Sequence, residues 1–395
     1  MVSYISSVGV DREGIHMTIL PENATLLGRV WNADAQGPSV VTIRAGEVID
    51  ITSKTAPLVR DICEMDAPSA YVTGSIGNSL GSVDDILSAP VGDMEQTHFL
   101  APCDLQSIKA CGVTFASSMV ERVIEEQAAG DPLKAEAIRK RVGQTIGDSL
   151  NNIVPGSKEA AQVKAALIKE GLWSQYLEVG IGPDAEVFSK AQILSSMGNG
   201  APVGLHPISN WNNPEPEVVL AVSSKGIIVG ATLGNDVNLR DVEGRSALLL
   251  SKAKDNNASC SIGPMIRLFD ADYSLDDVRK ADLDLTVTGL DGYVLHGKST
   301  MRKISRDPTD LVKATVGRHH QYPDGFMLFL GTLFAPTEDR DIPGQGFTHK
   351  LGDVVKITSP KLGRLTNSVQ LSTECIEWTF GTRALMSNLA RRNLL

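Results

Sequence analysis

Cysteine is scarce in this sequence, and its placement excludes two kinds of site. The five cysteines are widely spaced and contain no Cys-x-x-Cys pair; they are Cys63, Cys103, Cys111, Cys260 and Cys375. An odd, scattered set is not a disulfide framework, and it lacks the paired spacing of a zinc site. We therefore expect reduced, buried thiols, as in a cytoplasmic protein.

Long apolar runs and basic tracts are also missing. No run approaches the ~20 apolar residues of a membrane span, and the N-terminal stretch lacks the pattern of a secretory signal. The formal net charge is -10, and no tract or helix face is basic. This balance argues against nucleic acid or an anionic membrane as a partner. No glycine pattern of a dinucleotide or P-loop site occurs, so we expect a small-molecule partner and a cytoplasmic location.

Short strands fill the first part of the chain. Apolar runs at 24–27, 39–43 and 47–51 are separated by turn signals, and the segment 74–92 is polar and rich in glycine. This pattern predicts a small β-rich N-terminal domain over residues 1–104.

Helical signals come next. Apolar spacing predicts a helix over 117–129, Asp131-Pro132 begins another that reaches Leu150, and Ser157 caps a third that Gly171 ends. Their charged residues are expected on outer faces. We therefore expect a helical insertion over about 117–171.

Strands dominate the rest of the chain without a regular alternation of strand and helix. This favours an α+β architecture with a mostly antiparallel, sandwich-like core over a doubly wound sheet. We expect a catalytic domain over residues 105–395 that ends in an amphipathic helix, 381–394.

Three acids flank one predicted β-hairpin. Glu215 and Glu217 precede an apolar run, and the next apolar run ends in Gly234-Asn235-Asp236. Residues i and i+2 of a strand share a face. A two-residue loop at Ser224-Lys225 would pair Glu215 with Gly234 and place Asp236 on the face of both glutamates. Three converging carboxylates are typical of a Mg²⁺ or Mn²⁺ site.

Each candidate also has an ordinary structural interpretation. The acids could line a solvated strand edge, and Lys254, which follows an apolar run, could lie on the surface. Glu186 and Lys190 share one face of a predicted strand and could form a surface ion pair. The pair His319-His320 is most simply a loop feature.

Several blocks of the sequence resemble the fumarylacetoacetate hydrolase superfamily. They are WNNPEPEVVL, GNDVNLRD, AKDNNASCSIGP, GDVVKI and GRLTNSV, in that order. The resemblance implies a mixed β-sandwich-roll catalytic domain that binds Mg²⁺ or a similar cation. It implies metal ligands at Glu215, Glu217 and Asp236, a site lysine at Lys254, and a site threonine at Thr332, although Leu333 replaces the proline that usually follows.

One block departs from the hydrolases of that family. Hydrolytic members often have Gly-x-Asn-Tyr-x-x-His-x-x-Glu, whose histidine activates water. Here the block runs from Gly112 to Glu121, and Ser118 occupies the place of the histidine. The departure puts hydrolysis by a histidine-activated water in doubt.

The whole chain looks closer to the sugar-acid dehydratase branch of the family. GVTFASSMVERVIEE, GLWSQYLEVGIGPDAEVFSK and HQYPDGFMLFLGTLFAPTEDRDIPGQGFTHK carry this resemblance. It implies a metal-dependent hydro-lyase that converts 2-keto-3-deoxy-D-pentonate, derived from D-xylose or D-arabinose, to 2,5-dioxopentanoate and water. Closed symmetric assembly is the default for such enzymes, so we expect a homodimer or homotetramer.

The resemblance also suggests roles for individual residues. Glu186 would be the principal acid or base, and Lys254 would steady an enolate or carboxylate. Substrate contacts would come from Ser118, Glu121, Lys190 and Thr332.

Two alternatives remain open at this point. The first is a hydrolase that cleaves a 2,4-diketo-3-deoxy sugar acid, with a histidine supplied from elsewhere, for instance His206 or His319. The second is a protein that binds a metal and a keto acid without turning it over.

Overall fold

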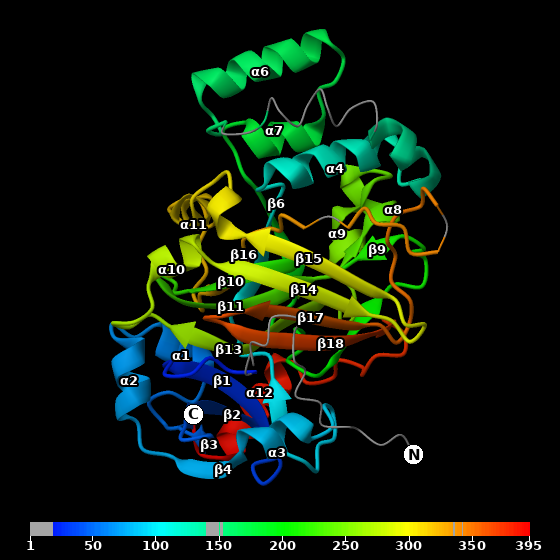
Figure 1. Cartoon of the computed structure of the whole chain (residues 1–395). Helices are drawn as coiled ribbons and strands as arrows, with labels where there is room; N and C mark the ends of the chain where they lie inside the picture. The colour runs from blue at the N-terminus through cyan, green and yellow to red at the C-terminus, as the bar shows by residue number, and fades with distance from the viewer. Residues whose placement is uncertain (1–18, 140–149, 151–152, 335, 342) are drawn as a thin grey trace.

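Two β-sheets pack face to face at the centre of the described structure (Figure 1). The computed structural model describes residues 19–139, 150, 153–334, 336–341 and 343–395. The larger sheet has eleven strands, in the order β4 (Asn78–Ser82), β3 (Glu47–Asp50), β2 (Gly37–Arg44), β1 (Leu26–Asn32), β13 (Cys260–Leu268), β11 (Ile228–Asp236), β10 (Pro216–Val222), β16 (Phe326–Phe329), β6 (Ser107–Gly112) and β7 (Glu186–Ala191), with β5 (His98–Leu100) beside β1.

The second sheet has five strands, and a two-stranded ribbon lies apart from it. The five-stranded order is β15 (Val294–Thr300), β14 (Asp282–Thr288), β17 (Val354–Ser359), β18 (Gly363–Leu371) and β8 (Pro202–Leu205). The ribbon pairs β9 (Asn212–Asn213) with β12 (Asn238–Leu239). Strand pairs are antiparallel except β16 with β6 and β18 with β8, which makes both sheets mixed.

The alternation of side chains along β10 explains how the sheets pack. Val218, Leu220 and Val222 belong to the core that also holds the inner residues of the five-stranded sheet. Val219 and Ala221 point to the opposite face and pack with the helical side of the N-terminal part. Because Glu217 lies two residues before Val219, it projects from that second face.

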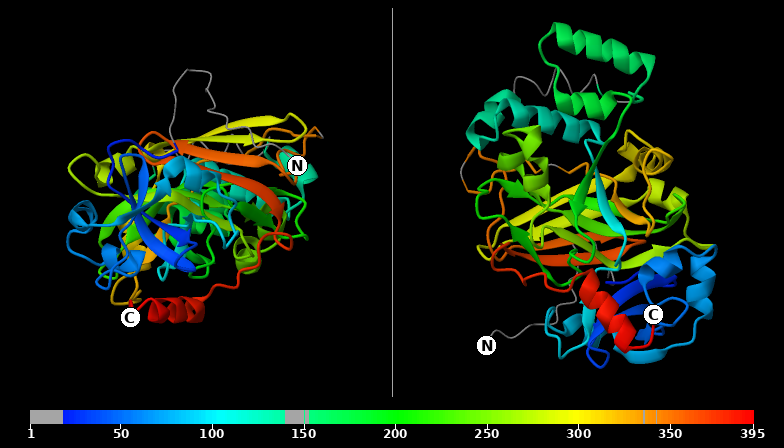
Figure 2. Two further views of the ribbon diagram at one scale, coloured as in Figure 1. Left: turned by 90° about the horizontal axis from the view of Figure 1, so that it is seen from below. Right: turned by 180° about the vertical axis from the view of Figure 1, so that it is seen from behind.

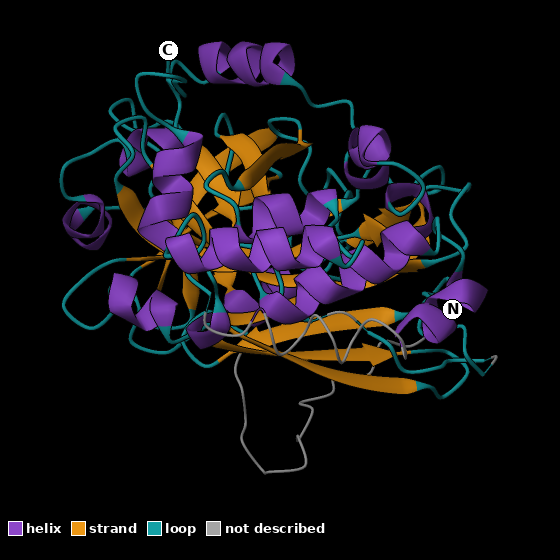
Figure 3. Cartoon of the chain, turned by 90° about the horizontal axis from the view of Figure 1, so that it is seen from above, coloured by secondary structure: helices purple, strands orange, loops and turns teal. Residues whose placement is uncertain are grey.

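A group of helices covers one end of the larger sheet (Figures 1 and 3). It contains α4 (Ala116–Gln127), α6 (Lys158–Lys169) and α7 (Gln175–Ile181). Ser157 caps α6, and Gly171 follows it with a φ of +69°, which confirms that prediction. Residues 132–139 are helical, whereas most of the remaining predicted helix to Leu150 lies outside the described residues.

Shorter helices connect the strands. They are α8 (Arg240–Glu243), α9 (Leu250–Lys254), α10 (Leu275–Arg279) and α11 (Pro308–Thr315), with single 3-10 turns at Ala247–Leu249 and Met301–Lys303. Of these, α8 and α9 directly follow β12 and carry charged residues toward the end of the β10–β11 hairpin.

The N-terminal part is built on strands that continue the larger sheet. Strand β1 pairs with β13, while α1 (Val59–Cys63), α2 (Pro68–Gly74) and α3 (Val83–Ser88) lie around its strands. The C-terminal helix α12 (Thr382–Arg391) packs against β2, as Figure 2 shows from behind. The segment expected to be only polar and glycine-rich contains β4 and α3. The predicted division at residues 104 and 105 stays a prediction.

Two expectations from composition can be compared with the structure. The five cysteines are buried and unpaired, which confirms that prediction. Among the described residues, no helix combines the length and the apolar character needed to cross a membrane.

Candidate metal centre

Three carboxylates meet at the open end of the β10–β11 hairpin. Each of Glu215, Glu217 and Asp236 offers an oxygen that lies within 4.8 Å of the oxygens of the others. All three side chains are buried, between 2% and 4% exposed. The structure therefore brings together the three predicted metal ligands.

The predicted register of this hairpin is wrong by two residues. Glu217, rather than Glu215, pairs with Gly234. The loop is longer than two residues because Gly226 takes a φ of +75° in the turn, and a bulge follows Ala221. The shift is even, so each acid stays on the predicted face.

Two lysines hold the acid cluster from one side. Nζ of Lys254 lies 2.7 Å from Oε2 of Glu215 and 3.0 Å from Oδ2 of Asp236. Nζ of Lys190 lies 2.9 Å from the other Asp236 oxygen. Lys254 is only 3% exposed, so its interpretation as a surface lysine is wrong.

Lys190 has a different place from the predicted substrate contact. Its side chain is fully buried beneath Asp236, where it also donates to the backbone carbonyl oxygens of Lys254 and Val237. It is not among the described residues that line the site cavity. Its contacts orient a candidate metal ligand, and among the described residues Lys190 pairs with Asp236 rather than with Glu186.

A small cavity of about 30 Å³ lies over the acid cluster. Glu186, at the start of β7, lines it, and Gly112 of β6 is its neighbour across the strand pair. A Cβ atom on Gly112 would lie 1.9 Å from Oε2 of Glu186. A glycine at this position therefore leaves room for the carboxylate.

The environment of Glu186 suits proton transfer near neutral pH. Burial, together with the neighbouring carboxylates of Glu243 and Glu215, raises the pKa of its carboxyl group to about 7, although Lys254 and Arg122 act in the opposite direction. A carboxyl group with such a pKa can both accept and release a proton under ordinary conditions.

Two charged residues of the cavity were missed from the sequence. Arg122 of α4 places its guanidinium 2.5 Å from Oε1 of Glu215, 2.5 Å from Glu125 and 3.1 Å from Glu243. Glu243 comes from α8 and is 3% exposed. A signal for Arg122 existed, because Ser118, Arg122 and Glu125 recur at the spacing of one helix face.

The remaining predicted contacts surround the same region. Ser118 and Thr332 line the cavity over the acids, and together with Glu121 they also line a second, adjoining cavity. The Ser118 hydroxyl donates to the Phe115 carbonyl at 2.8 Å. The Glu121 carboxylate accepts two hydrogen bonds from Arg139, at 2.9 and 2.8 Å.

Histidine does not contribute to this site among the described residues. The described residues that line the cavity include no histidine. The ring of His206 instead contacts the exposed side chain of Lys252 at 3.5 Å. His319 is exposed. Neither replacement histidine considered from the sequence lines the cavity.

The donor set fits a hard divalent cation. Carboxylate oxygens are the ligands that Mg²⁺ prefers, and these converge from one sheet face. Burial raises the pKa of Glu217 well above its usual range, and the nearby carboxylates of Asp236 and Glu215 raise the pKa further. Added positive charge at this point would relieve that repulsion.

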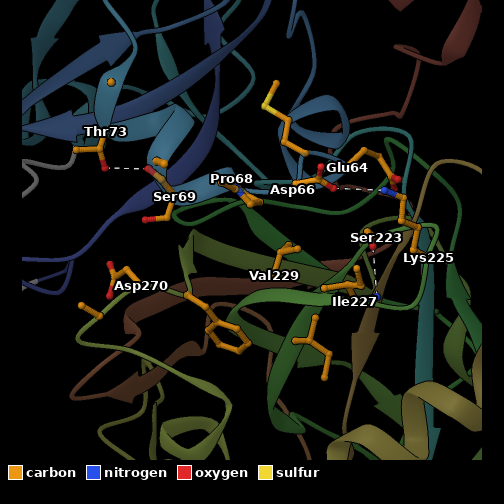
Figure 4. A pocket seen from close by; sticks show the side chains of 17 residues that line it. Glu64, Asp66, Pro68, Ser69, Thr73, Ser223, Lys225, Ile227, Val229 and Asp270 are labelled. Atoms are coloured by element: carbon orange, nitrogen blue, oxygen red, sulfur yellow. Dashed lines mark hydrogen bonds and ion pairs between the residues drawn. The ribbon is translucent and has the colours of Figure 1, made fainter.

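A larger groove of about 830 Å³ lies elsewhere, between the α1–α2 segment and the β10–β11 turn (Figure 4). Its charged groups have partners. Glu64 accepts hydrogen bonds of 2.6 Å from both the backbone and the hydroxyl of Ser224, and Asp270 accepts one of 2.8 Å from Thr25. The groove shares no lining residue with the cavity over the acids.

One family model matches the part of the chain that holds the acid cluster. Residues 198–370 match the family model described as "Fumarylacetoacetate (FAA) hydrolase C-terminal". This range contains Glu215, Glu217, Asp236 and Lys254.

Two curated relatives match about half of the chain. A probable 2-keto-3-deoxyxylonate dehydratase of Haloferax volcanii is 32% identical over 194 residues, which cover 49% of this chain and 63% of the relative. A 2-dehydro-3-deoxy-D-arabinonate dehydratase of Saccharolobus solfataricus is 28% identical over 185 residues, which cover 47% of this chain and 58% of the relative. The matches thus span less than two thirds of either relative.

A solved structure shares the fold over most of the chain. It is a 2-keto-3-deoxy-D-arabinonate dehydratase complexed with magnesium and 2,5-dioxopentanoate, with a TM-score of 0.60 and 20% identity. The superposition covers 88% of this chain and 99% of that one. It confirms the predicted α+β fold.

Proposed function

We propose that this chain is a metal-dependent hydro-lyase, because residues 198–370 match the model of the fumarylacetoacetate hydrolase family. It converts 2-keto-3-deoxy-D-pentonate to 2,5-dioxopentanoate and water. The observation that carries the proposal is one cavity that combines three buried carboxylates with the carboxyl group of Glu186. The names of the relatives support the substrate class.

The proposed cofactor is Mg²⁺, or Mn²⁺, held by Glu215, Glu217 and Asp236. When bound, such a cation supplies Lewis acidity that polarises the C2 keto group of the substrate. The residues around the cluster keep it ordered, because Lys190 fixes Asp236 and the backbone N–H of Gly331 donates to Glu217 at 2.6 Å.

Glu186 is the proposed proton acceptor. Its pKa of about 7 leaves a large ionised fraction at neutral pH, and it lines the same cavity as the acids. In the proposal it takes a proton from C3, where the adjacent keto group makes the C–H bond acidic. Its carboxyl group can then return a proton as the intermediate rearranges.

Lys254 is the proposed electrostatic support. Its ammonium group is buried and points into the acid cluster, and hydrogen bonds to charge that develops in the transition state are the ones that accelerate a reaction. In the proposal it donates to the oxygen on C2 as negative charge accumulates there.

Water loss follows from this arrangement. The C3 carbanion expels the C4 hydroxyl as water, with a proton supplied in the cavity. Loss of a C5 proton and tautomerisation then turn C5 into the aldehyde. Ser118, Glu121 and Thr332 are proposed to contact the hydroxylated end of the substrate. We also propose that the enzyme is cytoplasmic and forms a homodimer or homotetramer.

Product analysis tests this function. Purified protein with Mg²⁺ is incubated with 2-keto-3-deoxy-D-xylonate and with its L-enantiomer, and the products are identified by NMR. The proposal predicts a single five-carbon product, 2,5-dioxopentanoate, and its loss with a chelator. Failure with both enantiomers, together with cleavage of a 2,4-diketo-3-deoxy sugar acid into two fragments, would show a hydrolase instead.

A further inference from the structure

A second small cavity adjoins the one over the acids. Its volume is about 20 Å³, which is enough for one water-sized group, since a water needs at least ~10–15 Å³. The two cavities share four lining residues, Ser118, Arg122, Glu215 and Thr332. A molecule that contacts Glu215 from the first cavity therefore has its other end within reach of the second.

One residue that lines this second cavity has a buried atom without a partner. Asn213 lines it and is 3% exposed. Its Nδ2 donates to the Pro214 carbonyl at 3.0 Å, whereas its Oδ1 has no hydrogen-bond partner among the described residues. Buried polar atoms in folded proteins nearly always have a partner, so a donor from outside the chain fits here.

The charged groups around the cavity are already neutralised. Oε1 of Glu125 lies 2.7 Å from Arg240, and Oε2 of Glu125 lies 2.5 Å from Arg122. Arg139 neutralises Glu121. A further ion would disturb these pairs, whereas a neutral hydroxyl group can donate to Asn213 without altering the charge balance.

We infer that this second cavity is the subsite for the terminal hydroxyl group of the substrate, and that Oδ1 of Asn213 accepts its hydrogen bond. The inference rests on the proposed function, because that function places a hydroxylated keto acid over the acid cluster. Asn213 is then a specificity-determining residue. It favours keto acids with a terminal hydroxyl group over keto acids without one, because only that hydroxyl group can donate a hydrogen bond to its Oδ1.

Two unreactive ligands isolate this contact. 5-Hydroxy-2-oxopentanoate and 2-oxopentanoate differ by the terminal hydroxyl group, and neither has a C4 hydroxyl to lose. Calorimetric titration in the presence of Mg²⁺ gives the affinity of each. We expect the hydroxylated ligand to bind wild-type protein about tenfold more tightly, as one buried hydrogen bond allows.

Asn213→Ala should remove this preference and leave the affinity for 2-oxopentanoate within about twofold of the wild type. Asn210→Ala, at an exposed position of the same segment, is the matched control and should keep the preference.

Each other outcome overturns the inference. Equal affinities of wild-type protein for the two ligands would show that the cavity holds only water, whether or not the variant folds. A preference that survives in Asn213→Ala would place the hydroxyl group elsewhere. Binding of neither keto acid would contradict the proposed function and the subsite with it.

Discussion

Replacing Lys254 with methionine is expected to separate its electrostatic role from its packing. Methionine keeps most of the side-chain volume and removes the charge. Nζ of Lys254 lies 2.7 Å from Glu215 and 3.0 Å from Asp236, and the side chain is buried. The change therefore leaves two buried carboxylates with fewer cationic partners.

The size of the effect follows from that burial. Removal of one partner from a buried ion pair destabilises a protein by about 3 to 5 kcal/mol. For a chain of 395 residues, this corresponds to a fall in melting temperature of roughly 4 to 6 °C. A divalent cation restores positive charge to the cluster, so Mg²⁺ should raise the melting temperature more in Lys254→Met than in the wild type. Turnover should fall about 10²- to 10³-fold, as for loss of one transition-state donor.

Thermal melts with a chelator and with Mg²⁺ measure both effects. Lys252→Met is the matched control, because Lys252 lies on the same helix and is exposed. The control should melt as the wild type in both conditions. If metal-free Lys254→Met is as stable as the wild type, or if Mg²⁺ stabilises it no further than the wild type, the assigned electrostatics of the cluster are wrong.

Three further perturbations test other parts of the account. Glu186→Gln should lower turnover at least 100-fold and abolish a rise in rate as the pH increases through about 7, because burial places the pKa of Glu186 there and only the ionised form accepts a proton; an unchanged pH profile would exclude Glu186 as the base. Gly112→Ala should lower kcat and leave Mg²⁺ affinity unchanged, since the new Cβ would displace the Glu186 carboxylate; equal kcat in alanine and wild type would argue against that placement. Asp353→Asn should reduce the free energy of unfolding at pH 7 by about 3 kcal/mol, because the buried guanidinium of Arg340 then keeps only its longer, 3.3 Å contact with Asp291. Burial opposes its ionisation, but hydrogen bonds from Arg340 and His349 hold the pKa of Asp353 at about 2. Its stabilisation is therefore complete above the unfolded pKa of about 3.9 and disappears as the pH falls through about 2, so the variant should show a flatter loss of stability in acid, as chemical denaturation at several pH values will measure.

The hairpin illustrates what periodicity can predict. The side-chain period of a strand is two, so Glu215 and Glu217 had to share a face in any register. Asp236 joined them because the actual register differs from the predicted one by two residues. The loop length depended on the positive φ of Gly226 and on a bulge, which local sequence did not determine.

The tertiary partners of the charged residues on α4 could not be predicted from the sequence. Their charges were assigned to outer faces, as is usual for an amphipathic helix. Arg122 and Glu125 instead face α8 and the hairpin, where Arg240 and Glu243 complete the network. These partners lie about a hundred positions apart in the chain, and a helical period cannot identify which tertiary surface a charged face meets.

Lys190 was misplaced for a related reason. Its position in an alternating strand was compatible with either the surface or the site. Its full burial beneath Asp236 depends on the packing of α9 against β7, which brings the carbonyl oxygens of Lys254 and Val237 to Lys190. The continuation of the larger sheet into the N-terminal strands is likewise set by the long-range pair of β1 with β13.

The central claim is that Glu186 takes a C3 proton from a keto acid that a divalent cation holds over the acid cluster. Proton exchange at C3 of 2-oxopentanoate in D₂O tests it most directly, because this ligand cannot lose water and its C3 signal is followed by NMR. The account predicts exchange that requires Mg²⁺ and is lost in Glu217→Gln. Exchange at the same rate without the cation, or in the variant, would contradict it.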